Sequence, residues 1–173
     1  SYYPNNQQLL YAGGKLFIPS WRSLPGEPTF TIVNASTGAI LDNVTDLAGL
    51  DGGAYPALDG DVVFLNNGTL FAYDLKQHRL LWSLPSVGNG RGLSISPVGN
   101  SLKIYVVNNT VNANNLIQVD AQTGIVDWQS PNFVSYSIGV PPTDAAGRVI
   151  AVDFGGGAFS QSDGALLWST GGW

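Results

Sequence analysis

Short apolar runs separated by polar turn residues recur along the whole chain. The runs are rich in β-branched and aromatic residues and are bounded by glycine, asparagine, aspartate and proline, which is the pattern of strands. Clear examples are residues 15–18, 62–65, 102–107 and 148–152. No window of a dozen residues carries the apolar stripe of an amphipathic helix. The pattern therefore predicts an all-β protein.

The pattern also repeats after 86 residues without a gap. At that shift identical residues align, and Leu80-Leu81-Trp82-Ser83 falls on Leu166-Leu167-Trp168-Ser169. The chain of 173 residues is therefore an internal duplication of two halves.

Each half divides again into two units with the same order of strand, tight turn and strand. The turns begin 40, 46 and 40 positions apart, at Asn34, Asp74, Asp120 and Ser160. This period is typical of one four-stranded propeller blade. We therefore expect one all-β domain over residues 1–173, with β-propeller-type repeats in two tandem halves. Its four four-stranded blades have approximate limits 1–43, 44–84, 85–129 and 130–173.

The strands of the last unit show the expected plan of a blade. They are predicted near 136–139 and at 148–153, 157–161 and 165–169. The other units repeat this plan, and blades one and three are expected to have longer connections between their second and third strands.

A tryptophan follows the turn at a fixed interval in three of the four units. An aspartate or asparagine at the start of the turn can accept backbone N–H bonds, and a glycine four residues later takes positive φ without steric cost. The tryptophan ring is then placed to wedge between neighbouring blades. We expect this docking role for Asp74, Trp82, Asp120, Gly124, Trp128, Gly164 and Trp168.

Blade one departs from this plan. Asp42 occupies the position of the tryptophan, which predicts that blade one seals its neighbour less tightly or packs differently. His78 replaces the turn glycine of blade two, between Lys76 and Arg79. A lone histidine in a polar turn is expected to be solvated.

The repeat Ala-x-Asp-x-x-Thr-Gly-x-x-x-Trp resembles the blade motif of the pyrroloquinoline-quinone-type (PQQ-like) propellers. Residues 118–128 match it best, 72–82 are close, and blades one and four keep parts of it. The resemblance covers the whole chain and implies the propeller fold. The family includes both quinone dehydrogenases and cofactor-free scaffolds. We expect this chain to belong to the cofactor-free structural branch.

The enzyme branch of that family implies a quinone inside a ring of about eight blades, a calcium ion and often an adjacent cysteine pair. This chain has four units and no cysteine, and its acidic residues lie mostly in turns. Segments 51–53 and 58–61 lack the alternating oxygen ligands of a calcium loop. We therefore assign no catalytic, cofactor-binding or metal-binding residue, and expect neither a cofactor nor enzyme activity.

Composition and charge narrow the choice of partners. Charged residues make up 11% of the chain, against about a quarter in soluble domains. A net charge of −5 with scattered basic residues disfavours nucleic acid. Ser169 and Gly171 break the alternating apolar pattern of a membrane-spanning last strand, so we expect no membrane insertion. The chain begins at Ser1 without a signal peptide, so we expect a mature product or a segment of something longer.

Four sequons begin at Asn34, Asn43, Asn67 and Asn108. Glycans there would coat the blade edges, and the alternative is that Asn34, Asn67 and Asn108 are turn or strand-end residues. Aromatic residues outside the repeat are candidate interface residues, namely Trp21, Tyr2, Tyr3 and Trp173.

These observations favour a non-catalytic, extracellular or cell-surface β-propeller module with a structural or adhesive role. It would self-associate by ring completion or head to tail, as in a glycosylated filament, or bind other extracellular proteins or glycans. A closed four-bladed ring, a half ring and a fibre all stay open. The alternative function is a fragment of a quinoprotein-like dehydrogenase whose cofactor residues lie outside this chain.

Overall fold

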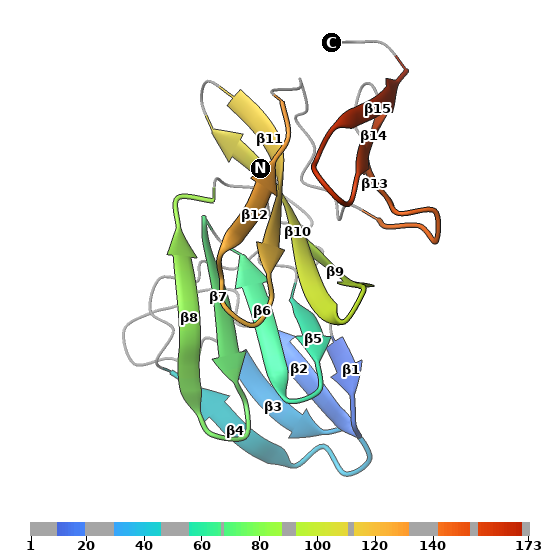
Figure 1. Cartoon of the computed structure of the whole chain (residues 1–173). Coiled ribbons are helices and arrows are strands. Elements are labelled where there is room, and N and C mark those ends of the chain that lie inside the picture. Colours follow the sequence, from blue (N-terminus) through green and yellow to red (C-terminus); the bar gives the residue numbers. More distant parts are fainter. Residues whose placement is uncertain are drawn as a thin grey trace, which may run out of the picture.

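The computed structural model describes residues 10–19, 30–45, 56–66, 68–87, 93–110, 113–131, 142–152 and 156–170. These residues form four antiparallel sheets, three of four strands and one of three (Figure 1). Within these ranges no helix is long and apolar enough to cross a membrane. The predicted all-β fold with propeller-type blades is confirmed.

The strands follow chain order within every sheet, each pairing with the next. Blade one contains β1 (Leu10–Ala12), β2 (Lys15–Pro19), β3 (Phe30–Asn34) and β4 (Ile40–Val44). Blade two contains β5 (Ala57–Asp59), β6 (Val62–Asn66), β7 (Thr69–Asp74) and β8 (Arg79–Pro85). Blade three contains β9 (Leu93–Val98), β10 (Ser101–Thr110), β11 (Ala113–Asp120) and β12 (Val126–Gln129). Blade four contains β13 (Arg148–Val152), β14 (Gly156–Ser160) and β15 (Leu166–Ser169).

The strands of blades three and four differ from the predicted plan in two details. The strand expected near 136–139 lies outside the described residues, and an isolated bridge joins Thr143 to Val149 beside β13. The long connection expected in blade three is wrong, because the pairing of β10 with β11 continues to Thr110 and Ala113. The extra residues lengthen both strands, which keeps their backbone groups hydrogen-bonded.

The third and fourth strands of every blade share one irregularity. Their register shifts by a bulge at Ile32/Val33, Ala72/Tyr73, Gln118/Val119 and Ala158/Phe159. A bulge increases local twist and redirects the following side chains. The residue that precedes the bulge on each third strand pairs with an equivalent residue on the fourth strand. These fourth-strand residues are Asp42, Trp82, Trp128 and Trp168.

Three apolar clusters fill the interfaces between consecutive blades, which we call seams one, two and three. Seam one joins blades one and two through Phe17, Phe30, Ile32, Val44, Val63, Leu65, Tyr73 and Leu75. Seam two contains Phe64, Leu70, Ile104 and Val119, and seam three contains Tyr105, Leu116, Val149 and Phe159. Successive residues of β6 face opposite seams because strand side chains alternate. Blades one and four lie at opposite ends of the molecule (Figure 1).

Candidate functional site

The tight turns between the third and fourth strands form a repeated site, and we call residues 34–38, 74–78, 120–124 and 160–164 the docking turns. In three of them the N–H of the closing glycine donates to the carbonyl of the first residue, at 2.9 Å in Gly38 and Gly124 and 3.0 Å in Gly164. These glycines have φ values of 71°, 73° and 71°. Their left-handed conformation explains why glycine recurs there.

The first side chain of each docking turn fixes its shape. In blade three, Asp120 Oδ1 accepts from the N–H groups of Gln122 and Thr123 at 3.2 and 3.0 Å. Asp74 accepts from Lys76 and Gln77 in the same way, at 2.9 and 2.8 Å. These bonds are those of Asx turns, so the local sequence builds the turn without help from neighbouring blades.

Seam two is closed by Trp82, which extends from β8 to the docking turn of blade three. Its Nε1 donates to the carbonyl of Ala121 at 3.0 Å. A Cβ added to Gly124 would lie 2.7 Å from the indole Cδ2, so the ring rests directly on the glycine. Only glycine allows this close stacking at that position.

Seam three repeats the arrangement with Trp128 on β12. Its Nε1 donates to the carbonyl of Gln161 at 3.0 Å, and a Cβ on Gly164 would collide with the indole. The same carbonyl accepts from Gln118 Nε2 at 2.8 Å, and this amide also donates to the Tyr105 hydroxyl at 2.9 Å. Burial raises the pKa of Tyr105, which keeps the phenol neutral in this seam. Trp128 is only 9% exposed.

In seam one, both the tryptophan and the glycine of this pair are replaced by polar residues. Asp42 Oδ2 lies 2.8 Å from His78 Nδ1, across the seam between β4 and the docking turn of blade two. His78 takes the place of the glycine with φ of 52°. The expectation that His78 is solvated missed this partner, although its side chain is 55% exposed. The available signal was that the tryptophan and the glycine of one seam are both replaced.

Trp168 has the register of the other two tryptophans, paired with Ala158, but a different environment. It is 42% exposed, and the neighbouring Leu166 and Leu167 are exposed as well. The expected seam role of Trp168 is therefore not fulfilled by the described part of this chain.

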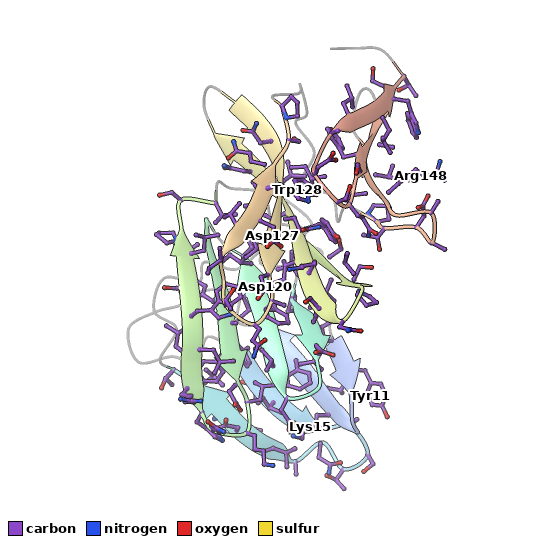
Figure 2. The ribbon with its side chains drawn as sticks, in the orientation of Figure 1. Tyr11, Lys15, Asp120, Asp127, Trp128 and Arg148 are labelled. Atoms are coloured by element: carbon purple, nitrogen blue, oxygen red, sulfur yellow. The ribbon has the colours of Figure 1, made fainter. Side chains whose placement is uncertain are left out.

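A charged group that sequence reasoning missed supports the docking turn of blade three. Lys103 Nζ lies 2.8 Å from Asp120 Oδ2 and 2.9 Å from Asp127 Oδ2, joining β10 to β11 and β12. Asp120 and Asp127 are labelled in Figure 2. The hydrogen bond from Lys103 lowers the pKa of Asp120, and the same hydrogen bond raises the pKa of Lys103. Both groups are thereby held in their charged forms. No cluster of metal-ligating side chains occurs among the residues described.

The sequon asparagines differ in their surroundings. Asn34 Oδ1 is engaged in its turn by Ser36 N at 3.0 Å and Ser36 Oγ at 2.8 Å, as the turn alternative expected. Asn43 is exposed on β4 and accepts from Thr31 Oγ1 at 3.0 Å. Asn108 is half-buried opposite Asn115. The other candidate residues lie outside the described ranges, namely Asn67, Tyr2, Tyr3, Trp21 and Trp173.

Consecutive four-stranded antiparallel blades that pack face to face define a β-propeller architecture. A family model described as outer membrane protein assembly factor BamB matches residues 26–171. The chain therefore belongs to this BamB-type family of PQQ-like propeller repeats. Among curated proteins none matches the chain.

Three solved structures show how widely this fold is shared. BamB from Moraxella catarrhalis is 22% identical, with a TM-score of 0.63, over 94% of this chain and 47% of that one. The computationally designed Ika8 protein is 15% identical, with a TM-score of 0.65, over 93% and 47%. A europium-containing methanol dehydrogenase is 16% identical, with a TM-score of 0.66, over 95% and 41%. At these identities the likeness shows the fold alone, and this chain spans less than half of each structure.

Proposed function

We propose that the chain is a non-catalytic structural propeller module that acts outside the cell or at its surface by joining protein surfaces. One observation carries this proposal. The residues that recur with the repeat, above all Trp82, Trp128, Gly124 and Gly164, are used to join one blade to the next. A repeat unit whose distinctive residues build interfaces is suited to assembly, because stacked repeats cover one another's apolar faces.

Its partners are further copies of the chain or other extracellular proteins and glycans. A surface with few charged residues favours association with such partners over nucleic acid. Glycosylation is part of this proposal, and Asn43 is the sequon residue whose exposed position supports it.

The glycan part is tested by secreting the chain from a eukaryotic host and measuring its mass before and after glycosidase treatment. We expect a mass loss in the native chain and a smaller loss in the Asn43→Gln variant. A secreted chain with the bare polypeptide mass would remove glycosylation from the proposed function.

The alternative is that the chain is a fragment of a quinoprotein dehydrogenase, which the structural likeness to methanol dehydrogenase suggests. That likeness carries the fold only. The test is to add pyrroloquinoline quinone and Ca²⁺ to the purified chain and to follow absorbance and thermal stability. We expect neither to change, whereas a saturable shift in both would overturn the non-catalytic assignment.

A further inference from the structure

We propose that Trp168 of one copy docks on the docking turn 34–38 of a second copy, and that two such contacts close a ring of two chains. This inference deepens the proposed function and rests on the self-association in it. The two seams already built within the chain define the geometry, because each pairs an indole with a glycine turn of the next blade.

The docking turn of blade one has the same geometry as those of blades three and four, and no described residue covers it. Gly38 has the same turn hydrogen bond and nearly the same φ as Gly124 and Gly164. A Cβ built on Gly38 meets nothing within 4 Å, whereas on the other two it meets a tryptophan. Among the residues that the structure describes, none occupies the site that an indole fills in seams two and three.

A hollow with a volume of about 470 Å³ adjoins this turn. Its lining includes Asn34, Ala35 and Ser36 of the docking turn, together with Tyr11, Gly13, Gly14, Lys15 and Leu41. Tyr11 and Lys15 come from β1 and β2 at the outer end of the molecule (Figure 2). The lining combines apolar surface with the backbone of the docking turn, which suits an indole that needs one hydrogen-bond acceptor.

Ala35 supplies that acceptor by its position. The N–H of Ala35 donates to the Gly14 carbonyl at 2.9 Å, just as that of Ala121 donates to Leu102 at 3.1 Å. In blade four the N–H of Gln161 donates to Gly147 at 2.9 Å. Since the carbonyls of Ala121 and Gln161 accept from the indoles of seams two and three, the Ala35 carbonyl is the equivalent acceptor for a third indole.

Trp168 is the matching indole. It lies on the last strand of blade four in the register of Trp82 and Trp128, and it is much more exposed than Trp128. Leu166 and Leu167 beside it are exposed too. Docking would remove this apolar surface from water.

A second copy is the occupant that the geometry favours. Blades one and four of one chain lie at opposite ends of the molecule, so β15 lies away from β3 and β4 of the same chain (Figure 1). This chain covers 47% of the length of BamB from Moraxella catarrhalis and 47% of that of Ika8, so two copies have about the length of either. Two identical head-to-tail contacts related by a two-fold axis close such a pair.

The test is sedimentation of the full 173-residue chain over a wide concentration range. We expect a reversible dimer, with a dissociation constant at least about tenfold higher in Trp168→Ala, as for a central interface tryptophan. Gly38→Ala should weaken the dimer similarly, because its Cβ enters the site of the indole. Gly99→Ala is the matched control, since Gly99 also has positive φ, of 60°, and open space but lies in the β9–β10 turn.

The two single variants also test each other. An equimolar mixture of Trp168→Ala and Gly38→Ala chains restores one intact contact, so it should form more dimer than either variant alone. Circular dichroism on each variant separates lost association from lost folding.

A chain that stays monomeric would overturn the docking proposal, and so would a dimer that both substitutions leave unchanged. Open polymers would overturn the closed pair. A different result would overturn the proposed function. Saturable binding of quinone and Ca²⁺ to the same samples would contradict a non-catalytic module, whatever the state of association.

Discussion

Seam one and seam three join equivalent strands and turns by different chemistry. In seam three a 9%-exposed indole stacks on glycine and donates to a backbone carbonyl. In seam one an aspartate meets a histidine at 2.8 Å, at the same register and at the same turn position. The same blade backbone therefore accommodates either pair at this position.

The two pairs differ in the stability that they provide. Burying an aromatic side chain of roughly 150–250 Å² contributes about 4–6 kcal/mol before entropy is subtracted. A surface contact between polar side chains, with one partner half-exposed, contributes about 0–1 kcal/mol. Seam one depends instead on its apolar cluster, where Phe30 and Tyr73 meet edge to face with centroids 6.3 Å apart.

The largest expected effect comes from removing the indole of seam three. Trp128→Ala should lower the free energy of unfolding by about 3–5 kcal/mol, because it leaves a cavity and removes one of the two hydrogen bonds to the Gln161 carbonyl. Chemical denaturation measures this loss. Trp168→Ala, studied at concentrations where the chain is monomeric, is the control and should cost less than about 1 kcal/mol. Equal losses in the two variants would show that seam three is not held by its indole.

The second-largest effect is expected at Gly164, the glycine on which the Trp128 indole stacks. Gly164→Ala should destabilise by about 2–4 kcal/mol, since positive φ and overlap with the indole act together. Gly38→Ala has the same φ of 71° without a neighbour, so it should cost about 1–2 kcal/mol in the monomer. The difference between the two midpoints in urea isolates the docking contact, and no difference would contradict the stacking.

Seam one can be converted to the chemistry of the other two. Asp42→Trp alone should destabilise, because the His78 Cβ occupies the place where the indole would stack. With His78→Gly added, the indole gains its slot and the Leu75 carbonyl as acceptor, by analogy with Ala121.

A double-mutant cycle measured by thermal and urea unfolding should give a favourable coupling of about 2 kcal/mol. Asp42→Asn is the reference variant, expected to lie within about 0.5 kcal/mol of the native chain. A coupling of zero would mean that the two positions do not face each other in solution.

The smallest expected effect concerns the charged support of the docking turn in blade three. The pKa of Asp120 is lowered on folding, so its contribution is present above its unfolded pKa of about 3.9 and is lost as pH falls through the lower folded value. The pKa of Lys103 is raised, so its contribution is present below its unfolded pKa of about 10.4 and is lost as pH rises through the higher folded value.

Asp120→Asn keeps the Asx-turn oxygen and removes the charge. It should cost about 1 kcal/mol at neutral pH, because Lys103 retains Asp127. It should also flatten the acid limb of the plot of stability against pH, measured by urea denaturation at each pH. If the variant loses stability at low pH as the native chain does, then Asp120 does not contribute to the acid dependence of stability.

Much of the fold was predictable because its signals are local. Strand alternation, the docking glycines and the Asx residues act within a few positions of one another, so the blades and turns could be read from the chain. The connection in blade three was misjudged, because turn residues such as asparagine do not reveal that β10 and β11 continue to pair to Thr110 and Ala113. Strand pairing there overrides local preference.

The sequence by itself determined the repeat, the strands and the turn that begins at each Asx or serine residue. The repeat also indicated which tryptophans and glycines meet at a seam, whereas the acceptor of each indole and the pair in seam one emerged only from the tertiary structure, because those contacts join residues far apart in the chain. The Trp82 indole meets a carbonyl 39 positions away, the Trp128 indole one 33 positions away, and Asp42 meets His78 across the first seam. The exact partners depend on how neighbouring blades pack against each other, and the burial of the three apolar clusters fixes that packing.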